Sequence, residues 1–176
     1  MDIEIFRSNN AIEAAKYRKL VMNRWLFELF LLKSLPMGFL AGLRVKHFDA
    51  QQCEISVPFR WLNQNPFRST YFAVLAMAAE MSSGMIAMMH THKSKPSVSM
   101  LVTRLESEFI KKATGITTFT CADGDGIREI IERCIITGEG QTYTCTAVGR
   151  SESGEEEARF RVTWSFKARK ERRDER

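Results

Sequence analysis

One long apolar segment constrains what this chain can fold into more than any other feature. It runs from about Ser69 to Met89, contains no proline and few β-branched residues, and is rich in alanine and methionine, a composition that favours a helix. A helix that is apolar on all sides has to be buried. Glu80 lies near its centre, and a carboxylate in such a place needs water, a partner subunit or a chemical role.

The segments around this helix change to the two-residue period of β-strands. "LRVKHFD" and "CEISVPF" alternate apolar with polar residues on either side of a turn at Ala50-Gln51, which predicts a hairpin. Residues 127–136, "IREIIERCII", are amphipathic, but their dense isoleucine content leaves both helix and strand open. We expect strands at residues 43–49, 53–59, 97–110, 116–123, 141–151 and 157–168.

The N-terminal part of the chain has a helical pattern. Asn10 followed by Glu13 resembles a capping box, and apolar residues recur at helical spacing to about Lys33, as one long helix or two short ones. The pattern is then broken by three residues that resist helix continuation, Pro36, Gly38 and Gly42.

These elements predict an α+β fold in which a curled antiparallel β-sheet wraps around one long central helix. The sheet needs one face covered, and a single helix is apolar enough to cover it. That arrangement is the hot-dog fold. We divide the chain into an N-terminal helical extension (1–35), the hot-dog domain (36–168) and a basic tail (169–176), with no second domain.

Composition limits the class of protein. The 44% hydrophobic and 27% charged content is ordinary for a soluble globular protein. Four cysteines without zinc-type spacing, and no leader-like start, predict a cytoplasmic protein with reduced thiols. The apolar run at 25–36 is too short to span a membrane and is either a core or interface helix or a membrane-surface contact. The basic run at 167–176 favours a solvated tail over an RNA or membrane contact, so we expect no nucleic-acid partner.

Several motifs are incomplete. No glycine-rich phosphate loop and no Ser-His-Asp order is present, which argues against nucleotide hydrolysis and serine chemistry. "DGDGIREIIE", from Asp123, lacks the third acidic ligand of a calcium loop. His90 and His92 have no obvious third metal ligand, and their place at a helix end suits the helix dipole. We expect no metal and no cofactor.

The central segment also carries a family resemblance. "NPFRSTYFAVLAMAAE", residues 65–80, resembles the start of the central helix in hot-dog acyl-CoA thioesterases, most closely in their uncharacterised-domain branch. The asparagine-to-glutamate spacing and the "AE" ending are kept. "EFIKKATG", residues 108–115, is similar to a strand end of the same family. The resemblance covers about residues 36–168.

The resemblance implies a catalytic site at the helix. Glu80 stands where the family keeps its catalytic acid, and Asn65 is a second catalytic candidate. Backbone amides at the helix N-terminus would stabilise an oxyanion, and the residues there are Tyr71, Phe72 and Ala73. The chain departs from the family patterns at Arg68, Phe72 and Ala73, which replace glycines, and at Pro66, which replaces a histidine.

The resemblance further implies an acyl-CoA or related thioester as substrate and a homodimer, with a tetramer also open. Basic residues would contact coenzyme A phosphates, and methionines would line an acyl tunnel; the alternatives are solvated lysines and core methionines. Glu80 could instead be paired with Asn65, Arg68 or Arg104. The candidate substrate-binding residues are Arg68, Arg104, Lys111, Lys112, Met77 and Met81.

Three functions follow. The first is an acyl-CoA thioesterase in which Glu80 acts as base or nucleophile. The second is a non-catalytic module that binds acyl-CoA or lipid in the same tunnel. The third is an interaction protein that uses the N-terminal helix and the basic tail.

Overall fold

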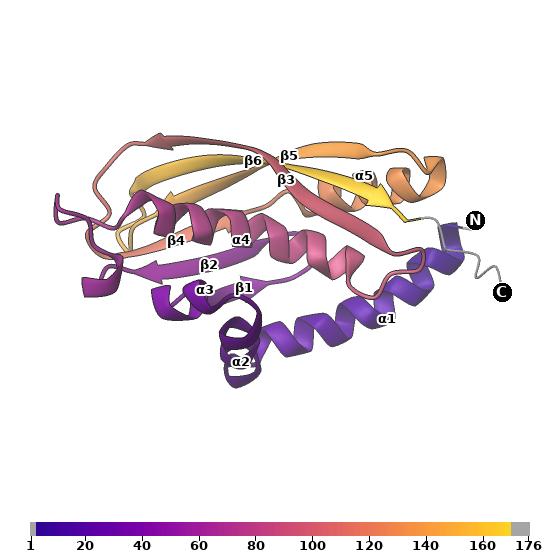
Figure 1. Cartoon of the computed structure of the whole chain (residues 1–176), viewed down its shortest axis with the longest axis horizontal. Coiled ribbons are helices and arrows are strands. Elements are labelled where there is room, and N and C mark those ends of the chain that lie inside the picture. Colours follow the sequence, from indigo (N-terminus) through magenta and orange to yellow (C-terminus); the bar gives the residue numbers. More distant parts are fainter. Residues whose placement is uncertain (1–2, 170–176) are drawn as a thin grey trace.

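The computed structural model describes residues 3–169, which form one antiparallel sheet with helices around it (Figure 1). The helices are α1 (Ile3–Met22), α2 (Arg24–Ser34), α3 (Pro36–Ala41), α4 (Phe72–Thr91) and α5 (Gly124–Thr137), with a short 3-10 helix, η1 (Trp61–Asn63). The strands are β1 (Arg44–Phe48), β2 (Cys53–Pro58), β3 (Val98–Phe109), β4 (Ile116–Cys121), β5 (Gln141–Arg150) and β6 (Glu156–Ala168).

The sheet confirms the predicted hot-dog fold. Its strand order is β1-β2-β4-β5-β6-β3, and every neighbouring pair is antiparallel. The long helix α4 lies along one face of the sheet, while α1, α2 and α3 lie beside β1 (Figure 1). The helix α5 packs against β5, β6 and α4. The sheet therefore surrounds α4 on one side and leaves part of its other side open.

The core lies between α4 and the inner face of the sheet. Ala78, Ala79 and Ile86 of α4 are completely buried, as is Phe119 of β4, whose ring meets Phe160 edge-on at 5.6 Å between centroids. By length and composition α4 could cross a membrane, but 67% of its most apolar window is buried inside the fold. Its apolar character is that of a core helix.

The N-terminal helices differ from the sequence expectation. The first helix begins at Ile3, so Asn10 lies inside α1, and the actual cap is Asn23, whose side chain accepts a hydrogen bond from the Leu26 N–H and starts α2. The predicted break contains the short helix α3. Pro36 fits its first turn, where no N–H is needed, and Gly42 ends it at φ 74°.

The structure also gives the type of residues 127–136 and the start of the central helix. Residues 127–136 lie inside α5, a helix with one strongly apolar face. The central helix begins at Phe72 and not near Ser69, because the backbone N–H of Thr70 bonds to the carbonyl of Ala113 at 2.8 Å and holds the preceding residues in a loop. Most of the predicted basic tail, residues 170–176, lies outside the described residues.

The edge strand β3 contains a bulge that keeps its apolar residues beside α4. The register with β6 shifts between Val102 and Arg104. A bulge adds one residue and so changes which side chains face the helix. Before the bulge Val102 faces inward opposite Trp164, and after it Leu105 faces inward opposite Val162. None of the twelve residues of β3 is fully buried, so this edge is open in the protomer.

The buried imidazole of His90, in the last turn of α4, gives the first prediction. Burial, together with the nearby charge of Arg128 and against the opposing effect of Glu132, lowers its pKa to about 4. Between pH 6.5 and 4 the unfolded chain therefore binds more protons than the folded chain. The unfolding free energy should decrease by about 3 kcal/mol as the pH is lowered through this window. Urea unfolding at pH 7 and pH 4.5 should show a smaller pH effect in His90→Gln than in wild type. Equal pH effects in the two proteins would contradict the prediction.

Candidate functional site

The start of α4 borders a cavity of about 530 Å³ between the loop before the helix and the loop after β3. Apolar side chains form most of its wall, and Phe109, Ile110 and Leu75 are among them. The cavity brings together five of the residues singled out in the sequence: Asn65, Tyr71, Phe72, Lys111 and Lys112. Two segments about 40 residues apart in the chain therefore line one cavity.

Asn65 organises the loop that leads into α4. Its side-chain oxygen accepts hydrogen bonds from the backbone N–H groups of Phe67, at 2.9 Å, and Ser69, at 3.2 Å. The same turn places Arg68 at φ 57°, in the left-handed region where the family pattern has a glycine, with its side chain exposed. Asn65 therefore holds the geometry of the loop, while Arg68 lies outside the cavity wall.

The N-terminus of α4 presents backbone donors. Tyr71 is the capping residue and makes no side-chain cap. The N–H groups of Phe72 and Ala73 have no hydrogen-bond acceptor within residues 3–169, and the helix dipole adds a partial positive charge there. Phe72 is 55% exposed as a residue, and its ring meets the rings of Tyr71 and Phe109 edge-on. Phe72 thus forms part of the wall and leaves its N–H available.

The carboxylate of Glu80 is half-buried and unpaired within the described part of the chain. Burial raises the pKa of this carboxyl group. Arg104, one of the alternative partners, bonds to Glu106 at 2.8 Å instead. A Cβ added at Gly84 would lie 3.4 Å from Oε1 of Glu80 and 3.1 Å from the Trp164 ring. The absence of a side chain at position 84 therefore lets the Trp164 indole pack closely against α4, next to the carboxylate.

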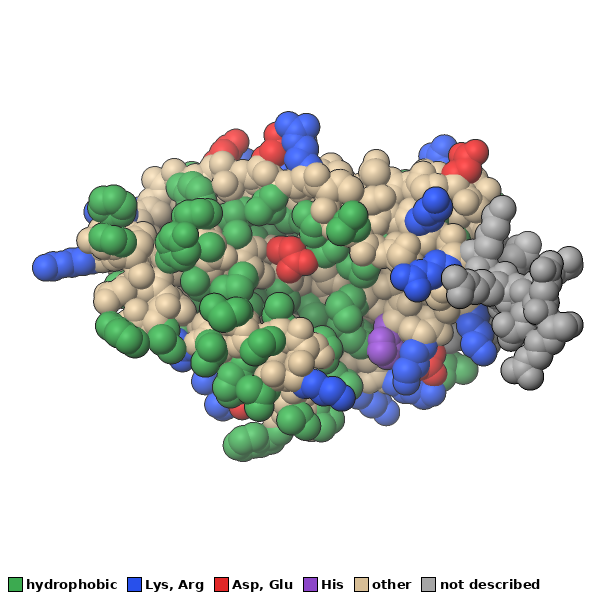
Figure 2. Space-filling model, in the orientation of Figure 1, with side chains coloured by type: hydrophobic (Ala, Val, Ile, Leu, Met, Phe, Trp, Pro, Cys, Tyr) green, Lys and Arg blue, Asp and Glu red, His purple; other side chains and the backbone are tan. Residues whose placement is uncertain are grey.

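Glu80 lies on a stripe of α4 that the protomer does not cover. Ala73, Ala76, Met77 and Glu80 are each partly exposed at helical spacing, whereas the residues between them on the other faces of the helix are buried. Figure 2 shows an isolated acidic side chain surrounded by apolar side chains on this face. Phe72 and Glu80 are eight residues apart, about 12 Å along the helix, so one thioester carbonyl cannot reach both within a single protomer.

The remaining candidates, except Lys111 and Lys112, lie apart from the cavity. Arg104 is exposed on β3, Met81 belongs to the core, and Met77 lies on the open stripe. Lys111 bonds to Glu155 at 2.6 Å. Lys112 is exposed and has no carboxylate partner among residues 3–169, so it is the cation at the cavity that is available to a ligand.

One cluster was not visible in the sequence. The atoms of Cys121, Asp123 and Cys145 that could bind a metal ion lie within 4.8 Å of one another. The Asp123 carboxylate accepts hydrogen bonds from the Thr146 N–H at 2.7 Å and the Cys121 thiol at 3.8 Å. Its interaction with the neighbouring Cys121 thiol and its burial raise the pKa of the Cys145 thiol. These contacts join β4, β5 and the start of α5, and they arise from strand pairing that the cysteine spacing does not reveal.

Comparisons with solved structures support the fold. A probable thioesterase of unknown function from Pseudomonas aeruginosa is 18% identical, with a TM-score of 0.70 over 81% of this chain and 95% of that chain. A protein of unknown function from Chlorobaculum tepidum is 15% identical, with a TM-score of 0.69 over 87% and 94%. A thioesterase from Haemophilus influenzae is 15% identical, with a TM-score of 0.59 over 80% and 88%. At these identities the likeness establishes the fold alone.

The family follows from the sequence match. A search of curated proteins found no match. Residues 23–166, most of the chain, match the family described as a domain of unknown function, DUF4442. This agrees with the predicted resemblance to an uncharacterised branch of the hot-dog thioesterases. The chain belongs to the DUF4442 family.

Proposed function

We propose that this protein is an acyl-CoA thioesterase whose catalytic site forms between two protomers of a homodimer. The observation that carries the proposal is the pair of unsatisfied groups on α4, the unpaired Glu80 carboxylate and the free N–H groups at Phe72 and Ala73. Thioester hydrolysis needs both a base or nucleophile and donors for an oxyanion. Each is present, and each lacks a partner within residues 3–169.

A two-fold axis would bring these groups together. For Glu80 of one protomer to approach Phe72 of the other, the axis has to pass close to Ala76, midway between them. Ala76 is small and partly exposed, so two antiparallel α4 helices can approach closely there. The open edge of β3 supports the same pairing, because Leu105 and Phe109 face the α4 side of the sheet and remain 46% and 51% exposed.

The chemistry follows from this arrangement. The thioester carbonyl oxygen accepts hydrogen bonds from the Phe72 and Ala73 N–H groups, which polarise it. The Glu80 carboxylate of the other protomer takes a proton from water, and the hydroxide adds to the carbonyl carbon. The C–S bond then breaks, and the coenzyme A thiol leaves with the proton. Because burial raises the pKa of Glu80, its carboxylate is a stronger base than an exposed glutamate.

A direct test is a thiol-release assay with short, medium, long and aromatic acyl-CoA thioesters. We expect the wild-type protein to release coenzyme A from at least one of these classes. If it binds acyl-CoA but releases no thiol from any of them, hydrolysis is the wrong function.

The second candidate is a non-catalytic acyl-CoA or lipid-binding protein with the same binding site. Phe72 favours it, because its ring stands where the thioesterase pattern has a glycine and narrows access to the backbone donors. Binding without turnover in the assay above would support this function.

Lys112 gives a prediction about the coenzyme A moiety. Replacing it with glutamine should raise KM for acyl-CoA about two- to five-fold with little change in kcat, because an exposed charge contact is worth up to about 1 kcal/mol. The same substitution at Lys46, on β1 away from the cavity, should leave KM unchanged. A thioester of N-acetylcysteamine, which lacks phosphates, should show no effect at Lys112. A uniform KM increase with both substrates would contradict phosphate contact.

A further inference from the structure

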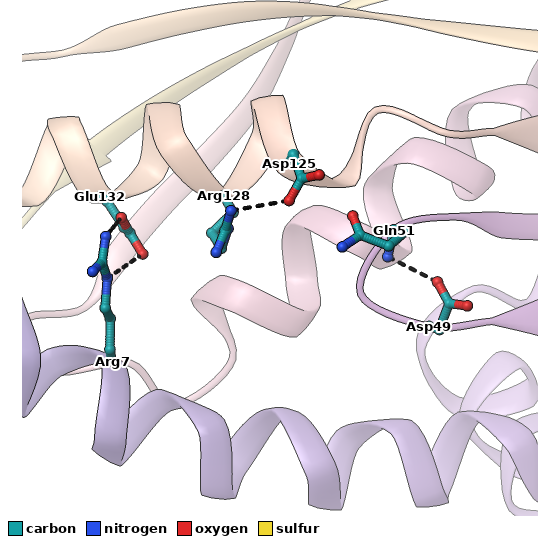
Figure 3. Close-up of polar contacts among 6 residues, drawn as sticks. All are labelled: Arg7, Asp49, Gln51, Asp125, Arg128 and Glu132. Carbon is teal, nitrogen blue, oxygen red and sulfur yellow. Dashed lines mark hydrogen bonds and ion pairs between the residues drawn. The ribbon is translucent and has the colours of Figure 1, made fainter.

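A second cavity, of about 720 Å³, lies between α1 and α5 and shares no residue with the cavity at the start of α4. The end of α4 and the turn between β1 and β2 complete its wall through Met89, His90 and Ala50. Figure 3 shows Arg7 of α1 joined to Glu132 of α5, and Arg128 pointing from α5 toward α1. This volume is within the range of small-molecule sites in proteins.

The cavity exists because α1 is held at both ends and is small in the middle. Near one end, Arg7 makes two hydrogen bonds to Glu132, at 3.0 and 2.7 Å. Toward the other, Arg18 donates from Nε to the carbonyl of Phe48 at 3.0 Å. Between them, the wall is formed by three alanines, Ala11, Ala14 and Ala15. Packing alone would favour larger side chains at such positions.

Two residues that line this cavity each carry a buried polar atom with no hydrogen-bond partner in the part of the chain that the structure describes. The atoms are Oδ1 of Asn10 and Nε2 of His90, and the two residues are only 8% and 9% exposed. An unsatisfied buried polar atom costs about 1–3 kcal/mol, and such atoms are rare in folded proteins. A hydroxyl group would suit both, since it can donate its one hydrogen to Oδ1 of Asn10 while its oxygen accepts from an Nε2–H of the neutral imidazole of His90.

The charges around the cavity favour an anion. Its wall contains four cations, Arg7, Arg18, Lys19 and Arg128, and a single acid, Glu132, which is already bonded to Arg7. Arg128 bonds to Asp125. Arg18 and Lys19 have no carboxylate partner within residues 3–169. A ligand carboxylate would neutralise part of the positive charge at this end of α1.

The unsatisfied polar atom of Asn10 and the cations Arg18 and Lys19 are separated along α1. Lys19 lies nine residues beyond Asn10, roughly 14 Å along α1, and the alanines lie between them. A ligand that reaches both therefore needs an apolar middle, with a polar group at each end. An extended ten-carbon chain, about this long, fits the separation.

We propose that the α1–α5 cavity binds an elongated hydroxylated aliphatic carboxylate. Its carboxylate lies near Arg18 and Lys19, its chain lies against Ala14 and Ile131, and its hydroxyl lies between Asn10 and His90. This site is separate from the thioesterase site and does not depend on it.

Titration calorimetry with 10-hydroxydecanoate tests the proposal. We expect saturable binding to the full-length protein, weakened at least about ten-fold in Ala14→Leu, because the added side chain fills the cavity. Lys19→Gln should weaken binding about two- to five-fold. Lys16→Gln is the matched control, because Lys16 is on the same helix, bonds to Glu13 and does not line the cavity. Decanoate, without the hydroxyl, should bind about five-fold more weakly.

The outcomes separate this site from the one at α4. Glu80→Gln should bind 10-hydroxydecanoate as tightly as wild type, whether or not the protein hydrolyses thioesters. No saturable binding, or undiminished binding to a folded Ala14→Leu variant, would overturn the proposal, the latter because the chain then lies elsewhere. Equal affinity for decanoate and 10-hydroxydecanoate would overturn the hydroxyl contact and with it the proposed ligand class. If circular dichroism shows that Ala14→Leu does not fold, Ala11→Leu, at an exposed position of the same wall, replaces it.

Discussion

Replacing Glu80 by glutamine is expected to lower kcat/KM for acyl-CoA by about 10²–10⁴-fold, because glutamine keeps the size of the side chain and removes its ability to accept a proton or attack a carbonyl. Acyl-CoA binding should change little, since the carboxylate acts on water and not on the coenzyme A moiety. The measurement is thiol release under substrate saturation and below it, with binding followed by calorimetry. Glu129→Gln, an exposed glutamate on α5 far from the α4 stripe, is the matched control and should keep full activity.

The same substitution has a defined effect on stability. Burial raises the pKa of Glu80 above its ordinary value of 4.5, so the native state binds more protons than the unfolded state just above pH 4.5. The contribution of Glu80 to the unfolding free energy is therefore present below pH 4.5 and is lost as the pH rises through the folded pKa. Near neutral pH, Glu80→Gln should be at least as stable as wild type in urea. A variant that is both inactive and unstable would point to a structural role for the carboxylate.

Replacing Ala76 by arginine is the second change with a large expected effect. The substitution adds a long charged side chain where the two-fold axis would pass, so the dimer should dissociate and thiol release should fall to the level of Glu80→Gln. Analytical ultracentrifugation would give the mass of the species, and the fold would be checked by circular dichroism.

The control for this prediction is Ala122→Arg, which introduces the same side chain at an exposed position after β4. It should remain dimeric and active. A wild-type protein that is monomeric and active, or an Ala76→Arg variant that remains dimeric with full activity, would contradict a site shared between protomers.

The fold could be predicted in outline because its strongest patterns are local. The central helix has no competing period. The first two strands are predicted from alternation, and the last two from their hairpin turn. The helix α3 was missed, because Pro36 and Gly42 read as breaks in sequence and are in fact its first turn and its cap. The type of α5 stayed open, since isoleucines suit both a helix and a strand until packing decides.

The candidate residues meet at the cavity only where a sequence motif lies next to it. Asn65, Phe72 and Lys112 meet at one cavity, and the roles assigned to Glu80 and its neighbours remain predictions. Arg104 and Met81 were selected by charge or spacing, but neither lines that cavity. The α1–α5 cavity could not be foreseen, because it depends on the distance between two helices more than 100 residues apart in the chain and on alanines that look ordinary in a helix.

The bulged edge strands have a consequence for how large an assembly can grow. Pairing of two β3 edges would leave β1 at both ends of the joined sheet. This strand has only five residues, and its own register irregularity lies at Lys46, which is exposed. A short, charged and irregular border is a poor template for another chain. The sheet would therefore stop growing after one addition, and the protein would form a closed particle and not a fibre.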